Sequence, residues 1–544
     1  MTTTQTVDIV WRKQNRLARE TIMLTPARSH GSRPWMGAVL LFTLLFPLDD
    51  VSGADLLEKT EAVPKQAISL ADAALRALQN NLDISISRRT KESRLTDIAF
   101  EQAKFDPLLS FNGQYNRSVQ PLNRPILGFG GNVPGVGGQP QPFDQNSVQS
   151  TIDMTQNLAT GANYDLNFSP SKVFVAGQNT FLFNPAYQSG LVFTLTQPLL
   201  RNMGTDVNKT FIRIAQNNAK VEEHVFLDRV MTVIATVEQT FWELVFTNEN
   251  LKVAEAALKA AQNLLAENRA KAKAGVMSIV DVLQAEAAVA SRVEQTLIAE
   301  KGIRDQEDQL RRLMNPGEGE LRLDVRLTPE DKPVVALEPI SLQEAIDVAI
   351  ERRPEVLQAN KNIESSDLNA KFAKNQLLPN LSFQGTAGLA GLGPNTADML
   401  KSNTSGDFYN YGAGLVLSFP LGNRSAISQY NLRQLEAQNA KASFQSVRQQ
   451  IIVGVREAVR RVQTDFKRIE TTRSARILSE KQLQAEQERL KVGLSTTRFV
   501  LDFQRDLAIA QGNELRAIVD YNKSLSNLSR HKATTLERYS LQLE

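Results

Sequence analysis

The chain has 544 residues, and its 62 Lys and Arg against 59 Asp and Glu give a formal net charge of +3. This near-neutral balance argues against nucleic-acid binding, because nucleic-acid binders carry a basic stripe or tail. With 0 Cys and 3 His, thiol catalysis and cysteine zinc sites are excluded, and a histidine metal cluster has almost no raw material. We therefore expect no enzyme, no metal site and no cofactor.

The N-terminal 53 residues have the pattern of a secretory signal with an extended basic region. Basic residues precede a short apolar run at 36–46, and small residues follow at 51–54. A basic region, a short apolar core and small residues at the cleavage position define such a signal. A membrane anchor is the alternative, but the run is short for a spanning helix. Any later crossing of a membrane must then use β-strands, because no comparable apolar stretch follows.

The rest of the chain is an internal duplication. Residues 68–70 and 340–342 both read Ile-Ser-Leu, and an ordered series of further matches follows. Such self-similarity predicts two pseudo-symmetric units. We divide the chain into repeat one at 66–314, a linker at 315–339, repeat two at 340–532 and a tail at 533–544. The paired landmarks are Pro107 and Pro379, Pro198 and Pro420, and Gly275 and Gly493.

Each repeat contains period-2 segments that predict two strands. Apolar residues alternate there with mostly uncharged polar ones, which is typical of a strand with two different faces. A strand of about 10 residues is long enough for a tilted crossing of an outer membrane. A sheet packed on a soluble core is the alternative. The predicted strands are about 107–117, 187–198, 379–388 and 409–420, and the four prolines mark the strand-to-helix junctions.

Repeat one carries an additional alternating pair at about 146–169, with Ala159-Thr160-Gly161 between its halves. This pattern predicts a hairpin. The hairpin either forms an outward flap, which leaves four strands in the chain, or joins the other strands, which makes six. We favour the flap.

Long helices follow the strands in both repeats. Apolar residues recur every seven residues, from Val230 to Leu265 in repeat one and, interrupted by Arg476, from Val455 to Leu490 in repeat two. This is a coiled-coil period, and a helix of about 65 residues is about 100 Å long. Gly275 and Gly493 follow these helices as stop residues. The predicted helices are about 202–274, 278–313, 423–491 and 496–528.

Four strands cannot close a barrel, and open strand edges cannot lie in lipid. Several copies must therefore share one transmembrane barrel, which their long helices continue as a tube. The predicted fold class is an α+β membrane protein built from duplicated helix–strand–strand–helix repeats.

The order of these features resembles the TolC-type outer-membrane efflux protein family. The resemblance rests on the turn Gly-Val-Met-Ser-Ile-Val-Asp-Val-Leu at 275–283, on Gln-Pro-Leu-Leu at 197–200 and on the duplication. It implies a homotrimer in outer-membrane lipid, with a 12-stranded barrel and a long periplasmic α-barrel. It also implies a passive exit duct of a tripartite efflux or type I secretion system. The implied partners are a periplasmic adaptor and an inner-membrane pump of the RND, ABC or MFS type. A periplasmic coiled-coil adaptor or scaffold is the alternative function.

The family pattern places acids just after the tip glycine, at a narrow periplasmic entrance. Repeat one has Asp281 there, and repeat two has Phe499 at the same place and Asp502 three residues later. In a trimer these acids form two carboxylate rings that attract cations. Ser278-x-x-Asp281 is also a capping box, which is the alternative role for this acid. We expect Phe499 to narrow the aperture of this entrance. Arg498 either pairs with an acid of a neighbouring helix or is an exposed cation. Gly275, Gly493 and Ser278 are expected to shape the helix tips for docking of the adaptor.

Overall fold

A computed structural model describes residues 64–122, 141–176, 181–336 and 339–539. The predicted signal at 1–53 lies outside these residues. Among the helices of the described ranges, none is both long enough and apolar enough to cross a membrane.

Four helices of repeat one have counterparts in repeat two, and a fifth, short helix has none. In repeat one the helices are α1 (Leu70–Asn80), α2 (Leu82–Gln102), α3 (Thr205–Asn208), α4 (Thr210–Lys273) and α5 (Ile279–Met314), with a 3₁₀ turn, η1 (Ala103–Phe105), after α2. In repeat two the counterparts are α7 (Leu342–Arg352), α8 (Pro354–Asn375), α10 (Arg424–Lys491) and α11 (Thr497–His531). Ser69 and Ser341 cap the first helix of each repeat by accepting a backbone N–H bond from Asp72 and Glu344. The duplicated Ile-Ser-Leu is therefore a duplicated helix start.

The segment predicted as a linker contains α6 (Glu318–Leu321) and β7 (Arg326–Pro329). β7 pairs in parallel with β1 (Lys65–Ile68) at the start of repeat one. The predicted tail contains α12 (Thr535–Arg538), which is followed by Tyr539. The Tyr539 hydroxyl donates to Oε1 of the buried Glu238 at 2.5 Å, so the tail is fastened to α4.

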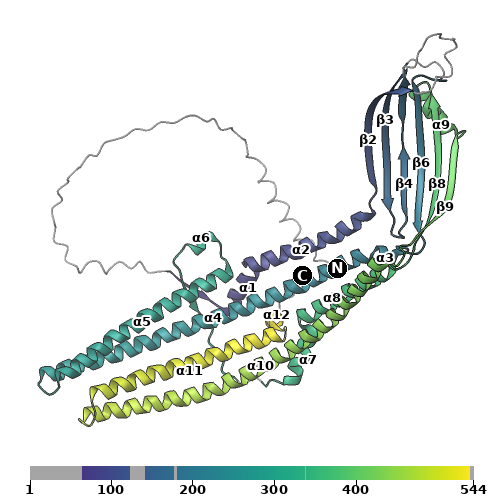
Figure 1. The fold of residues 1–544 in the computed structure, drawn as a ribbon. Coiled ribbons are helices and arrows are strands. Elements are labelled where there is room, and N and C mark those ends of the chain that lie inside the picture. The colour runs from purple at the N-terminus through teal and green to yellow at the C-terminus, as the bar shows by residue number, and fades with distance from the viewer. Residues whose placement is uncertain (1–63, 123–140, 177–180, 337–338, 540–544) are drawn as a thin grey trace, which may run out of the picture. The chain divides into compact units, whose positions relative to one another are not determined.

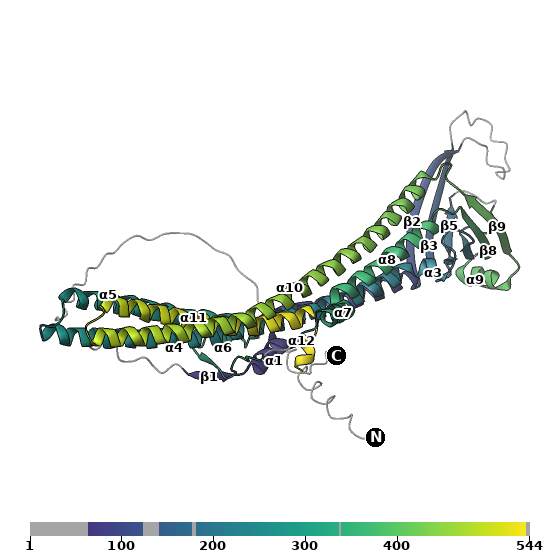
Figure 2. The ribbon, with the colours of Figure 1, turned by 90° about the horizontal axis from the view of Figure 1, so that it is seen from below.

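The long helices lie side by side, and the large sheet lies at one end of them (Figures 1 and 2). Its strands are β2 (Leu108–Leu122), β3 (Gln141–Asn157), β4 (Asn163–Phe168), β5 (Ser171–Val175), β6 (Ala186–Pro198), β8 (Asn380–Gly393) and β9 (Tyr409–Ser418). The short helix α9 (Thr396–Ser405) connects β8 to β9 and packs on β8 and β6.

The favoured flap is wrong, and so is the count of four strands. The sheet runs in the order β2-β3-β4-β6-β8-β9, with β5 paired to both β3 and β6. The predicted hairpin is thus part of the sheet, between the two strands that were expected to be its only members in repeat one. Alternation identified the hairpin, but it carries no information on which strands pair.

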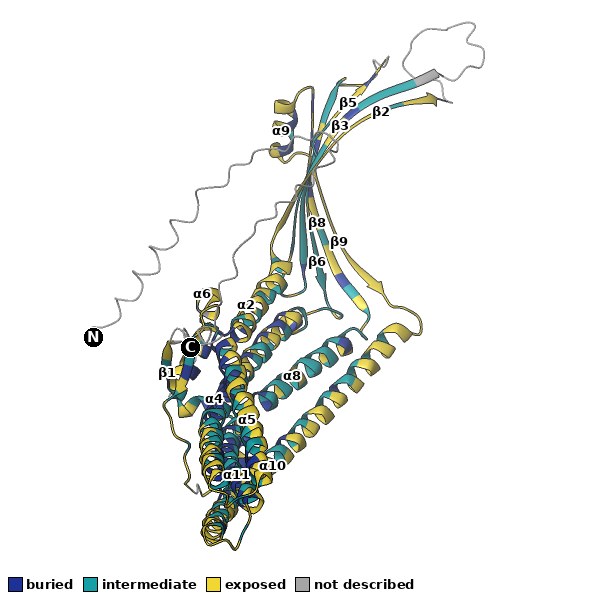
Figure 3. Cartoon of the chain, turned by 90° about the vertical axis from the view of Figure 1, so that its left-hand side faces the viewer, coloured by how far each residue is buried: buried dark blue, intermediate teal, exposed yellow. Residues whose placement is uncertain are grey.

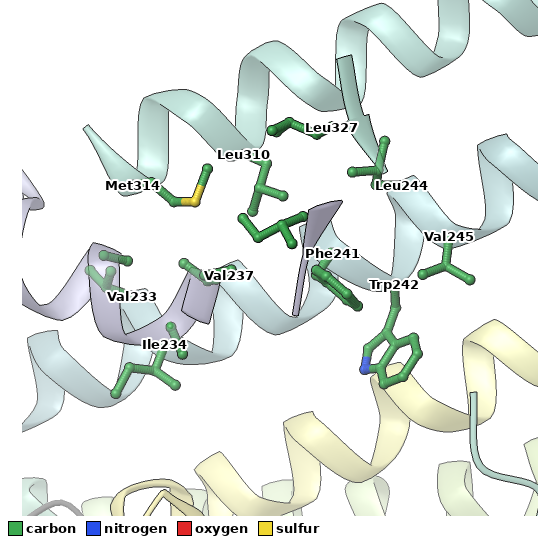
Figure 4. Close-up of a cluster of buried hydrophobic side chains, with 14 of the residues drawn as sticks. Val233, Ile234, Val237, Phe241, Trp242, Leu244, Val245, Leu310, Met314 and Leu327 are labelled. Carbon is green, nitrogen blue, oxygen red and sulfur yellow. The ribbon is translucent and has the colours of Figure 1, made fainter. Parts of the chain in front are cut away.

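Each repeat has its own apolar core around its long helices. In repeat one, Val230, Val237 and Leu244 of α4 are fully buried, and Figure 4 shows Val237 and Leu244 near Leu310 of α5. In repeat two, the equivalent cluster gathers around Val455 of α10. The seven-residue rows predicted from the sequence supply both cores.

Polar contacts join the two repeats. Glu243 of α4 accepts from Arg516 of α11 at 2.6 Å and also from Lys523 of α11. Burial opposes ionisation of Glu243, but the two cations outweigh it and lower its pKa. The helices of the two repeats are therefore held together by ion pairs as well as by apolar contacts.

Candidate functional site

The candidate site is the pair of helix tips, defined as the turns 274–278 between α4 and α5 and 492–496 between α10 and α11. Both turns have the same backbone geometry, with positive φ at Gly275 (75°) and Gly493 (78°). In both, the residue after the glycine donates its N–H to the third-last helical carbonyl: Val276 to Lys271 at 3.0 Å and Leu494 to Arg489 at 2.8 Å. This is the Schellman ending, which favours glycine because an L side chain is strained at positive φ.

The returning helices begin differently in the two repeats. Ser278 caps α5, and its hydroxyl accepts from the N–H of Val280 at 3.2 Å. A capping box would use the N–H of Asp281 instead, and that N–H bonds to the backbone carbonyl of Ser278 at 3.2 Å. Asp281 is half-buried in the first turn of α5, and no ion pair within the described ranges involves it. Its carboxylate is therefore available at the tip.

Asp502 has a different electrostatic setting from Asp281. Its carboxylate lies 3.2 Å from the guanidinium of Arg505 and 4.0 Å from that of Arg498, both on its own helix. The side chain of Arg498 is 78% exposed, so its ion pair is of the weak surface type. The structure thus places Arg498 beside an acid of α11 itself. Phe499 is exposed on the next position of the same turn.

A third arginine, Arg292 of α5, is close enough to Arg505 for their charges to interact. Burial lowers the pKa of Arg292, and the charge of Arg505 lowers it further. Arg505 is therefore paired with an acid of its own helix while its charge also acts on a cation of the neighbouring one.

The sequence prediction missed a buried polar link just above the tips. Asn268 of α4 and Thr497 of α11 are 0% and 1% exposed, and the Asn268 amide donates to the Thr497 hydroxyl at 3.1 Å. The same amide contacts the backbone carbonyl of Asp281 at 3.4 Å. Asn268 thus joins α4, α5 and α11. It lies on a buried face of α4 whose other residues include the apolar Ala261 and Leu264. A polar residue on that face was the available signal.

The strand-to-helix junctions lie at the opposite ends of the long helices. Pro198 ends β6, while Pro107 and Pro379 directly precede β2 and β8. The junctions of the two repeats touch, because the N–H of Leu199 bonds to the carbonyl of Leu381 at 2.8 Å. Pro420 lies two residues beyond β9. These positions mark where sheet geometry changes to helix geometry.

The fold is that of outer-membrane channels. It matches the solved outer-membrane channel OprN with a TM-score of 0.64 at 15% identity, covering 86% of this chain and 90% of that one. It also matches the CmeC outer membrane channel of Campylobacter jejuni with a TM-score of 0.62 at 15% identity, covering 91% and 94%.

Sequence comparison places the chain within a family. It is 24% identical to outer membrane protein TolC of Vibrio cholerae over 331 residues, which is 60% of this chain and 73% of that protein. Residues 74–316 and 345–531 match the outer membrane efflux protein family, so the chain belongs to this family. The TolC-type resemblance is confirmed. The protein is thus an efflux channel of the outer membrane with a large periplasmic part, and it is a transport protein and not an enzyme.

Proposed function

We propose that three copies of this chain form the outer-membrane exit duct of a tripartite efflux or type I secretion system. The observation that carries the proposal is the open sheet. β2 pairs only with β3, and β9 pairs only with β8, among the strands of the described ranges. Unpaired backbone at both edges is untenable in lipid. Pairing of β9 in one copy with β2 in the next removes every open edge.

The apolar residues of the two edge strands support this arrangement. Phe111 and Tyr115 of β2 are 72% and 67% exposed, and Tyr411 of β9 is 83% exposed. Figure 3 shows exposed residues along β9. A single copy therefore presents to solvent the kind of surface that belongs against lipid or another chain.

The helical layer has matching unpaired flanks. α2 packs on α4, and α10 packs on α8 and α11, so α2 and α10 have their outer sides free. Both helices expose large apolar side chains on these sides: Leu82, Ile86, Leu95 and Phe100 on α2, and Ile427, Leu432, Leu435 and Val453 on α10. Contact between neighbouring copies would bury these side chains and extend the sheet as a helical tube.

In the proposed system the duct is passive, and an inner-membrane pump of the RND, ABC or MFS type supplies the energy. A periplasmic adaptor docks at the helix tips near Gly275 and Gly493. Docking favours a state in which the helix pairs realign outward, which is a population shift between two coiled-coil packings. Asp281 and Asp502 then line the entrance as two levels of carboxylates.

The test is assembly of the full-length protein in detergent and its conductance in planar lipid. We expect a heat-modifiable trimer that conducts ions. Tyr411→Asp on the apolar face of β9 should lower the trimer yield, because a charge facing lipid is costly. The matched control is Asn410→Asp, one residue earlier on the opposite face of the same strand. A water-soluble monomer without conductance would refute the proposal.

A further inference from the structure

The hairpin of β3 and β4 separates two strands that have directly paired counterparts in repeat two. β8 and β9 pair with each other through the register Asn380↔Ser418 to Leu389↔Tyr409. Their repeat-one equivalents, β2 and β6, do not pair, because β3 and β4 lie between them. The insertion has therefore widened the sheet of repeat one.

The hydrogen-bonded ladder is continuous across the insertion. β2 and β3 stay in register over the whole length of β2, from Leu108↔Thr155 to Leu122↔Gln141. β4 and β5 together fill one strand position, since both pair with β3 on one side and with β6 on the other. The sheet therefore has six strand positions in each chain.

The inserted strands also continue the two faces of the sheet. Directly opposed residues form rows across the six positions, and two rows on one face are apolar throughout, while a further row on that face contains Lys172. One apolar row is Phe111, Ile152, Phe168, Leu191, Leu389 and Tyr409, and the next is Leu109, Met154, Leu166, Phe193, Ala387 and Tyr411. The row between them is Ser110, Asp153, Asn167, Val192, Gly388 and Asn410. Apolar-out and polar-in alternation is the pattern of a membrane wall.

The turn of the hairpin is seated where the helices meet the sheet. The N–H of Gly204, before α3, donates to the carbonyl of Thr160 at 3.0 Å. The side-chain amide of Gln156 donates to the carbonyl of Phe105 at 2.8 Å. Gly161 has a φ of 94°, and a Cβ there would collide with the carbonyl oxygen of Asn202. The hairpin thus reaches the helix end of the sheet and is fixed there.

We infer that this hairpin is part of the membrane wall, so that the trimer proposed above closes through eighteen strand positions and not twelve. This inference rests on the proposed function for the number of copies. Barrel diameter grows roughly in proportion to strand number, so the wall is about 1.5-fold wider than a twelve-strand wall. The outer-membrane section then passes bulky solutes freely, and the helix tips are the part of the duct that selects solutes by size.

Disulfide formation tests the strand order in the full-length protein, which has 0 Cys of its own. Opposed residues of neighbouring strands lie within reach of a disulfide. Oxidation should link L109C with M154C, which joins β2 to β3, and L166C with F193C, which joins β4 to β6. The pair L109C and L195C would oppose each other if β2 paired with β6 as β8 pairs with β9, and it should stay unlinked. Linkage of this third pair without the second would overturn the inference.

Spin-label accessibility tests whether the hairpin faces lipid. Ile152→Cys lies in an apolar row, and Asp153→Cys is its matched control on the opposite face. In vesicles, a label at 152 should collide with oxygen dissolved in lipid, and a label at 153 with a nickel chelate in water. Equal access of the nickel chelate to both labels would place the hairpin in water and overturn the inference.

The copy number and the wall diameter are measured by mass in detergent and by end-on electron microscopy in nanodiscs. Eighteen positions predict a wall about 37 Å across, against about 25 Å for twelve. A trimer with the narrower wall overturns this inference alone. A copy number other than three overturns the proposed function and the eighteen-position count, while the disulfide pairs still decide where the hairpin lies.

Discussion

Removing the Asn268 amide should favour opening of the duct. Asn268 is completely buried and donates to the Thr497 hydroxyl at 3.1 Å, and it also contacts the carbonyl of Asp281 at 3.4 Å. Of these two hydrogen bonds, only the bond to Thr497 joins the α4–α5 hairpin to α11, because Asn268 and Asp281 both belong to that hairpin. A movement of the α10–α11 hairpin away from the α4–α5 hairpin must separate Asn268 from Thr497.

The size of the effect follows from the hydrogen bonds that each substitution removes. A typical intramolecular hydrogen bond contributes about 1 kcal/mol net. Asn268→Ala removes the one bond that opening breaks, the bond to Thr497, or about 1 kcal/mol per copy, which is roughly a fivefold shift towards the separated arrangement. Thr497→Val removes the same bond from the other side and keeps the shape, so we expect a shift of similar size, about fivefold.

Single-channel recording in planar lipid measures this shift as open probability. Asn268→Ala and Thr497→Val should both lie above wild type, by a similar factor. Asn263→Ala is the matched control, because Asn263 is an exposed asparagine of the same helix. Wild-type open probability in Asn268→Ala, with normal trimer yield, would show that the link does not hold the closed state.

Three further predictions concern the tips and the helical layer. The double variant of Asp281→Ala and Asp502→Ala should weaken block of the channel current by multivalent cations, and unchanged block would remove the carboxylate rings from the mechanism. Oxidation of Asn268→Cys with Thr497→Cys should abolish export while trimers still form; export through a fully oxidised protein would contradict gating by hairpin movement. Burial and two nearby arginines lower the pKa of His531 in the folded protein. Below the ordinary pKa of about 6.5 the unfolded state therefore binds more protons than the folded state, and the stability of the protein should fall as the pH drops from 7 to 5. His531→Gln should flatten this dependence of the thermal midpoint, and an equal slope in both proteins would count against it.

The long helices were predictable because a seven-residue period is visible within one segment. The same rows also show where a single chain is incomplete. Val230, Val237 and Leu244 are fully buried, whereas Leu251 and Leu258, closer to the tip, are only half-buried. The sequence pattern continues unchanged along α4 although the burial within one copy does not. This difference supports packing against neighbouring copies towards the tip.

The remaining features depend on residues far apart in the chain. The Asn268–Thr497 link joins residues 229 positions apart, and no local pattern reports it. Gly454 lies within the continuous helix α10, where a Cβ would lie 3.2 Å from the ring of His531 on α11. The hairpin was visible as alternation, but its place in the sheet depends on pairing with β2 and β6. The sequence pattern therefore did not predict which strands pair or which distant residues come into contact.

The two ends of the molecule depend on different contacts, and this makes their roles separable. At the sheet, a single chain has two open edges and exposed apolar rows, so substitutions such as Tyr411→Asp act on the fit of the sheet to lipid and thereby on assembly. At the tips, the link between Asn268 and Thr497 lies within one chain and is already complete. Substitutions at the sheet should therefore change assembly with little effect on the conductance of the trimers that do form. Substitutions at the tips should change conductance and leave the yield of trimers unaltered.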